Sequence, residues 1–142
     1  MSLDAAGGRS FEAMSEEECL DLLHQGWMGR VAVIIAGVPA IFPVNYCAEG
    51  REIYFMTGEG SKLSAAVRSA VVAFEIDHAD PVYHYGWSVL AVGEAHEIHD
   101  ERIRASVAAR LAPWAPGDRK HLIRIWPDFV SGRRVDSARP QH

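Results

Sequence analysis

The chain has few cysteines, no long apolar run and no signal for export. Two cysteines, Cys19 and Cys47, occur among 142 residues, so no disulfide framework is expected and both are predicted to be free thiols in a reducing cytoplasm. No stretch approaches the roughly 18 apolar residues of a membrane helix, and residues 1–9 lack the basic and apolar regions of a signal peptide. We therefore expect a cytoplasmic protein without a membrane partner.

The chain also lacks a large excess of positive charge. Its formal net charge is −5, which argues against a general affinity for nucleic acid but leaves room for a small anion site built from local cations. Hydrophobic residues make up 49% and charged residues 23% of the chain, as in ordinary globular domains. We predict one domain over residues 13–136, with flexible tails at residues 1–12 and 137–142.

Three helices are predicted around the domain. The first begins after Ser15, because Ser15 and Glu18 match the capping box S-x-x-E, and it ends at Gly26. Short apolar faces at helical spacing predict two further helices at residues 61–69 and 101–111.

Extended patterns dominate the rest of the chain, with short connections that favour antiparallel hairpins over βαβ units. Pro43 predicts an edge strand or a bulge, and Gly93 predicts a bend or bulge. A turn at Pro127-Asp128 separates two final strands. The fold class is mainly β, a closed or half-closed six- to seven-stranded antiparallel Greek-key barrel with peripheral helices. The predicted strands are residues 30–35, 40–47, 52–57, 71–77, 86–98, 121–126 and 129–135.

The segment from Thr57 to Leu63 is the most informative candidate site. A strand ends, two glycines turn the backbone, and a helix begins with Ser61 and Lys62. Free N–H groups at a helix start, hydroxyls and an ammonium group suit a phosphate. The alternative is that Ser61 only caps the helix and Lys62 is solvated. The spacing is not that of a P-loop.

Two other segments have a functional and a structural interpretation. Pro43 removes a ladder donor, which exposes neighbouring backbone groups to the polar edge of a flat heterocycle. Trp87 offers a flat apolar face and Ser88 a hydroxyl. From the residues alone, an ordinary edge strand and a core tryptophan are the favoured interpretations.

No catalytic arrangement stands out, and catalytic residues stay unassigned. The seven histidines are scattered, and His96 and His99 lie near a strand end without the spacing of a zinc site, so no metal is expected. Glu94, His96 and Glu97 are expected on solvated parts of a strand.

Together the motifs resemble those of the pyridoxamine 5′-phosphate oxidase-like proteins, in particular the branch similar to nitroimidazole-resistance proteins. The resemblance spans residues 15–135, and each motif is weak singly, whereas their order and spacing are specific. The segments that carry it are Gly29-Arg30-Val31-Ala32, Pro43-Val44-Asn45-Tyr46, Ile53-Tyr54-Phe55-Met56-Thr57, Gly60-Ser61-Lys62-Leu63, Val72-Ala73-Phe74-Glu75-Ile76-Asp77, Gly86-Trp87-Ser88-Val89 and Pro113-Trp114-Ala115-Pro116-Gly117.

This resemblance implies a split-barrel homodimer that binds FMN at the subunit interface, with a flavin-dependent oxidoreductase activity on a small organic substrate. It places Pro43, Val44 and Asn45 along the isoalloxazine. It places Thr57, Ser61 and Lys62, followed by Leu63, at the phosphate. It places Trp87 and Ser88 near the flavin, either from the same subunit or from the other one.

One position departs from the family. Relatives commonly have Arg where this chain has Met56, and Met cannot supply a bidentate, charge-assisted phosphate contact. FMN binding is then weak, or Arg30, Arg68 or Arg133 replaces the missing charge. The alternatives are a deazaflavin (F420) reductase, which Met56 and the negative net charge disfavour, and a haem-binding or non-catalytic protein that uses one of the histidines.

Overall fold

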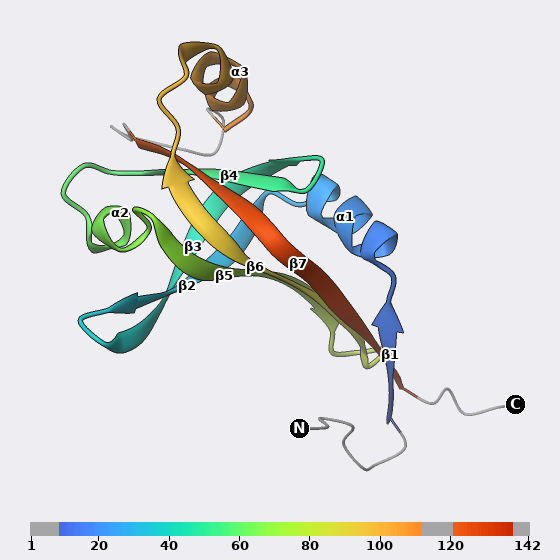
Figure 1. Ribbon diagram of the computed structural model, residues 1–142. Coiled ribbons are helices and arrows are strands. Elements are labelled where there is room, and N and C mark those ends of the chain that lie inside the picture. The colour runs from blue at the N-terminus through green and yellow to red at the C-terminus, as the bar shows by residue number, and fades with distance from the viewer. Residues whose placement is uncertain (1–8, 112–120, 138–142) are drawn as a thin grey trace, which may run out of the picture.

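The computed structural model describes residues 9–111 and 121–137 (Figure 1). These residues form seven strands and three helices, and consecutive strands with no helix between them pair as antiparallel hairpins. In chain order the elements are β1 (Arg9–Met14), α1 (Glu16–Gln25), β2 (Met28–Ile35), β3 (Val38–Glu49), β4 (Glu52–Thr57), α2 (Lys62–Ala66), β5 (Ala70–Asp80), β6 (Tyr85–Glu97), α3 (Glu101–Leu111) and β7 (His121–Ser137).

Six of the strands close into a ring. Their order is β7-β4-β3-β2-β5-β6, and a further ladder between β6 and β7 completes the circuit. Every described pair is antiparallel. Closure pairs the backbone N–H and C=O groups of strand edges that would otherwise be open to aggregation. The predicted mainly β, antiparallel barrel with peripheral helices is therefore confirmed.

The last strand corrects the prediction of two strands around a Pro127-Asp128 turn. β7 runs unbroken from His121 to Ser137, and the irregularity appears instead as a bulge. Val92 pairs with Phe129 and Gly93 with Pro127, so Asp128 is the extra residue. A Cβ on Gly93 would lie 2.0 Å from the Trp126 carbonyl oxygen, so only glycine fits. The bulge predicted at Gly93 is confirmed.

The predicted N-terminal tail is wrong in part. Residues 9–14 form strand β1, which pairs with the end of β7 from Arg9 opposite Ser137 to Met14 opposite Gly132. Ser137, placed in the C-terminal tail, belongs to this ladder. Residues 1–8 and 138–142, like the motif at residues 113–117, lie outside the described residues.

The three helices lie close to the positions that the capping box and the apolar spacing predict. The Ser15 hydroxyl accepts from the backbone N–H of Glu18 at 3.1 Å, and α3 has the predicted bounds. α2 is five residues long, shorter than expected. Gly26 ends α1 with φ −81°, and glycine is needed there because a Cβ would lie 2.1 Å from the Tyr46 hydroxyl oxygen. No helix in the described ranges is long and apolar enough to cross a membrane.

Two apolar clusters hold these elements in place. The main one fills the barrel, and α1 packs on it through Cys19 and Leu23. The second lies between the barrel wall and α3. It consists of Cys47, Tyr54, Ile98, Val107, Leu111 and Leu122, with Met56 and Ile103 packed against them.

Candidate functional site

The residues predicted to bind a cofactor lie at two opposite ends of the barrel. Thr57 pairs with His121 at the start of β7, whereas Ser88 pairs with Arg133 near its end. The β7 segment between residues 121 and 133 spans roughly 40 Å at about 3.3 Å per residue. Figure 1 shows α2 and the β5–β6 hairpin far apart. We call these the α2 end and the hairpin end. One chain therefore does not bring all the predicted residues together.

At the α2 end, the structure does place two predicted segments side by side. The β3–β4 ladder stops at the pair formed by Tyr46 and Phe55, and Asn45 and Val44 continue β3 just beyond it, as Thr57 ends β4. Val44 packs in the barrel core, so its side chain is not available to a ligand. Thr57 is 1% exposed, and its buried Oγ1 has no hydrogen-bond partner among the residues that the structure describes.

The start of α2 is only partly suited to an anion. The Ser61 hydroxyl donates to the Gly58 carbonyl at 3.0 Å and accepts from Ser64 N–H at 3.0 Å. It must break the first bond to donate to a phosphate. Leu63 packs in the barrel core, so its side chain has a structural role. Lys62 is exposed, which leaves its ammonium group as the available charge on this helix.

The structure shows where the Met56 side chain packs. It also shows which of the three arginines lies near enough to the α2 end to replace the missing positive charge. Met56 points away from the barrel interior and packs in the cluster beneath α3. Arg30 is paired with two carboxylates on β5, and Arg133 lies at the hairpin end. Arg68 follows α2 and is close enough to Glu97 to contribute to the lowered pKa of that carboxylate.

A histidine–carboxylate pair lies at the α2 end, and no sequence pattern predicts it. His121 Nδ1 lies 2.8 Å from Glu97 Oε2, and both side chains are largely buried. The hydrogen bond from His121 is the main cause that lowers the pKa of Glu97. His121 Nε2 is buried and has no hydrogen-bond partner within residues 9–111 and 121–137. Glu97 was expected to be solvated, and only the pairing of β6 with β7 reveals its real partner.

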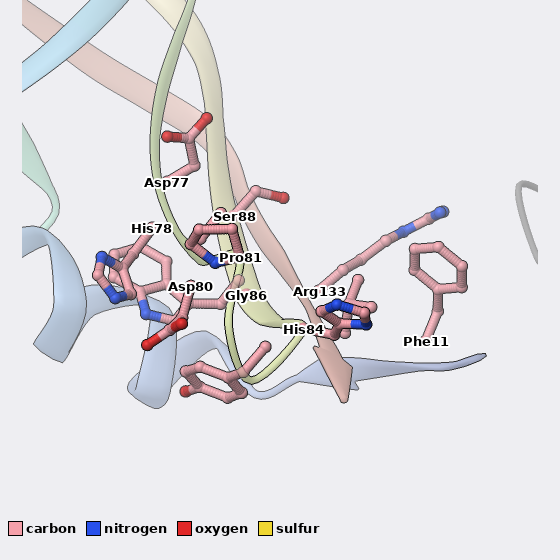
Figure 2. A pocket seen from close by; sticks show the side chains of 13 residues that line it. Phe11, Asp77, His78, Asp80, Pro81, His84, Gly86, Ser88 and Arg133 are labelled. Carbon is pink, nitrogen blue, oxygen red and sulfur yellow. The ribbon is translucent and has the colours of Figure 1, made fainter. Parts of the chain in front are cut away.

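At the hairpin end, Trp87 and Ser88 line a pocket of about 670 Å³ (Figure 2). This volume is in the range of small-molecule sites. Asp80 has a structural role, because its carboxylate accepts from Val82 N–H at 2.9 Å in the hairpin turn. The lining residues comprise aromatic and aliphatic walls and several polar groups: Phe11, Asp77, His78, Ala79, Asp80, Pro81, His84, Tyr85, Gly86, Trp87, Ser88, Arg133 and Val135.

Trp87 separates this pocket from a smaller one. Its ring lies 6.3 Å from that of His78, tilted by 35°, and it packs against the edge of the barrel core. A pocket of about 380 Å³ on its other side shares Asp77, His78 and Trp87 with the first and continues toward the end of α1. The tryptophan is thus both a core-edge residue and a flat wall between two cavities.

Between the two ends, a charged cluster lies on the outer face of the barrel. Arg30 Nη1 lies 3.2 Å from Glu75 Oε1 and 3.4 Å from Asp77 Oδ2. Burial, together with the neighbouring Asp77, raises the pKa of Glu75 to about 7, against the opposing effect of Arg30. Pro43 pairs with Arg30 where β3 has no partner on its other side within the described ladders, so its predicted edge position is confirmed.

Within residues 9–111 and 121–137, no three His, Cys, Asp or Glu side chains are grouped closely enough to hold a metal ion. The site predictions for Pro43, Val44, Asn45, Thr57, Ser61, Lys62, Leu63, Trp87 and Ser88 stay predictions of cofactor contact.

Comparison with known proteins identifies relatives in sequence and in fold. The uncharacterized protein Rv0080 of Mycobacterium tuberculosis is 34% identical over 139 residues, which cover 93% of this chain and 91% of the relative. The FAD binding protein of Mycobacterium smegmatis is 32% identical, with a TM-score of 0.70 over 88% of this chain and 98% of that one.

A provisionally assigned 5-nitroimidazole antibiotic resistance protein of Bacteroides thetaiotaomicron shares the fold at 13% identity. Its TM-score is 0.76 over 91% of this chain and 90% of that one. The sequence profile of the pyridoxamine 5′-phosphate oxidase family matches residues 15–134. The chain therefore belongs to the pyridoxamine 5′-phosphate oxidase family.

Proposed function

We propose that the protein binds a flavin nucleotide and uses it for redox chemistry on a small organic substrate. The observation that carries the proposal is the 32% identity, over 88% of this chain, to the FAD binding protein of M. smegmatis. FMN is the cofactor predicted from the sequence, and FAD is the one named for that relative. Both carry the same isoalloxazine and the same first phosphate, so the geometric argument holds for either.

The α2 end fits the phosphate. The Thr57 hydroxyl is buried and finds no partner in the described part of the chain, and the exposed Lys62 begins α2 five residues later in the chain. A phosphate oxygen can accept from a hydroxyl and from an ammonium group, and such charge-assisted bonds are stronger than neutral ones. Asn45 lies just beyond the end of the β3–β4 ladder, on the strand next to the one that carries Thr57.

A second copy of the chain is needed to complete the site. Because the α2 end and the hairpin end are far apart, we propose a homodimer in which Lys62 of one subunit and Trp87 of the other meet one flavin. The outer face of β2, β3, β5, β6 and β7 is apolar enough to be the contact. Its side chains, each at least 37% exposed, include Met28, Ile34, Ile41, Val71, Leu90 and Phe129, and large exposed apolar patches mark interfaces.

The flavin supplies the electron-transfer chemistry when it is bound, and the chain supplies binding and orientation. Trp87 presents a flat wall in the larger pocket, and Ser88 offers a hydroxyl on the outer face. The pocket has room for a small organic molecule. No side chain is assigned as acid or base.

The first test is the absorption spectrum of the freshly purified protein, followed by mass spectrometry of what heat releases. A flavin spectrum with an FMN or FAD mass supports the proposal and identifies the nucleotide. A colourless protein that binds neither FMN nor FAD contradicts it. A Soret band, or tighter binding of the deazaflavin F420 than of FMN, would replace it with one of the two alternatives.

Lys62→Ala tests the phosphate contact. We expect FMN affinity to fall about tenfold, the lower end for a charge-assisted bond, because the ammonium group is exposed. Affinity for riboflavin, which lacks the phosphate, should not change. Arg102→Ala on α3 is the matched control, since it removes an exposed cation elsewhere. Unchanged FMN affinity in Lys62→Ala would remove this residue from the site.

Ile41→Asp tests the homodimer. Ile41 is 68% exposed in the single chain, so the substitution should leave the fold intact and disrupt only a covered interface. Light scattering should show a dimer for the wild-type protein and a monomer for the variant, with loss of flavin binding. A wild-type monomer that binds flavin would contradict the shared site.

A further inference from the structure

Two buried polar atoms without partners belong to directly paired residues at the α2 end. Thr57 Oγ1 and His121 Nε2 are both covered and bonded to nothing in the described structure. Thr57 and His121 are the last pair of the β4–β7 ladder, and directly paired residues point to the same face of a sheet with their Cβ atoms about 5 Å apart. A buried polar atom is costly to leave unpaired, so this spot favours a ligand with polar oxygens.

Glu97 orients the histidine. The Glu97 carboxylate lies 2.8 Å from His121 Nδ1. A carboxylate only accepts, so Nδ1 carries the hydrogen and donates a hydrogen bond to it. Nε2 is then directed away from the carboxylate, and the same carboxylate stabilises the imidazolium that forms when Nε2 also gains a proton. This arrangement prepares Nε2 as a donor to an anion.

The charges around the pair are mainly positive. Arg68 acts on Glu97 together with His121 and His99, and all three lower the pKa of that carboxylate. The His99 ring is 80% exposed and lies 3.8 Å from Glu97. The exposed Lys62 follows Thr57 on α2. Lys62, Arg68 and a protonated His121 then supply positive charge at this end, against the carboxylates of Glu97 and of Glu59, which lies between Thr57 and Lys62 in the chain.

We propose that His121, oriented by Glu97, is a phosphate-binding residue that donates from Nε2 to the flavin nucleotide beside the Thr57 hydroxyl. This inference rests on the proposed flavin binding and adds a residue to it. The imidazolium supplies the positive charge that Met56 cannot. Because Met56 packs beneath α3 on the opposite side of the strand, the replacement comes from β7 rather than from β4.

The test compares FMN with riboflavin in matched variants. His121→Asn keeps an amide donor near the Nδ1 position for Glu97 and removes the group at Nε2. His121→Gln keeps a neutral donor near the Nε2 position, and His99→Asn is the control on the other side of Glu97. Affinities are measured by quenching of flavin fluorescence, with circular dichroism to establish that each variant is folded. Thr57→Val, which is isosteric, serves as a second variant.

We expect His121→Asn to weaken FMN binding at least tenfold, as for loss of a charge-assisted bond, and to leave riboflavin binding within about twofold. His121→Gln should be intermediate, and His99→Asn should match the wild type.

The outcomes separate this inference from the proposed function. If FMN and riboflavin bind to the wild-type protein and His121→Asn weakens both equally, the pair is structural and the inference is wrong while flavin binding stands. The same holds if His121→Asn binds FMN as the wild type does. If the wild-type protein binds no flavin, the proposed function fails and the inference fails with it.

Discussion

Glu75→Gln should stabilise the protein above neutral pH and have little effect in mild acid. Burial beside Asp77 raises the pKa of Glu75 from 4.5 to about 7. In the folded state the carboxyl therefore holds a proton between pH 4.5 and 7 that the unfolded chain has released. Stability must fall as the pH rises through that window, because the native state binds more protons there. Gln mimics the protonated acid and removes the loss.

The magnitude follows from the shift. A rise in pKa of this size lowers the free energy of unfolding by at most about 3.4 kcal/mol at pH 8, at about 1.36 kcal/mol per pKa unit. The Glu75 side chain is 33% exposed, so solvent screening reduces the effect to about 1.5 kcal/mol. In a chain of this size that raises the Tm by about 4 °C. Covering the outer face with a second copy would increase the effect in the same direction.

The assay is urea unfolding of wild type and variant at pH 5 and pH 8. The Gln side chain can still accept from Arg30, so the geometry of the cluster is preserved. Glu94→Gln is the control, because Glu94 is an exposed acid whose partner is His96, and it should change stability by less than about 0.5 kcal/mol at either pH. Equal effects of Glu75→Gln at the two pH values, or destabilisation at pH 8, would refute the reasoning.

Three further substitutions test the fold. Gly93→Ala should destabilise the barrel by more than about 2 kcal/mol and shift the β6–β7 register, because its Cβ would meet the Trp126 carbonyl oxygen at 2.0 Å; an unchanged Tm would contradict the bulge. Tyr46→Phe removes a buried 2.7 Å hydrogen bond to the Leu23 carbonyl and should cost about 1–3 kcal/mol in chemical denaturation. Ser15→Ala should cost about 1 kcal/mol through the lost cap, whereas Ser15→Asp, which also caps, should cost less.

The local sequence patterns located most of the elements and the family. The cap at Ser15, the helix end at Gly26 and the bulge at Gly93 are each predicted by a few neighbouring residues, and each lies at the predicted position. Such features depend on neighbours in the chain, so the sequence shows them directly. The order of weak motifs likewise identified the family, since that order can be read along the chain without the fold.

The errors lie where a distant segment decides the local structure. Pro127 and Asp128 read as a turn, but the β6 strand opposite them absorbs the extra residue as a bulge and β7 continues. Residues 9–12 read as a loose tail, yet the free edge of β7 binds them as part of β1. Neither partner is visible in the segment itself.

The sequence alone determined the residue types that the site can use: a hydroxyl at Thr57, an ammonium group at Lys62 and an aromatic ring at Trp87. Only the tertiary structure decided their grouping. It separated Trp87 from Thr57 by most of the length of β7, and it set His121 beside Thr57 through the β4–β7 ladder. The reason is that ring closure pairs residues far apart in the chain, and the register of each ladder, which no local pattern encodes, fixes which side chains meet.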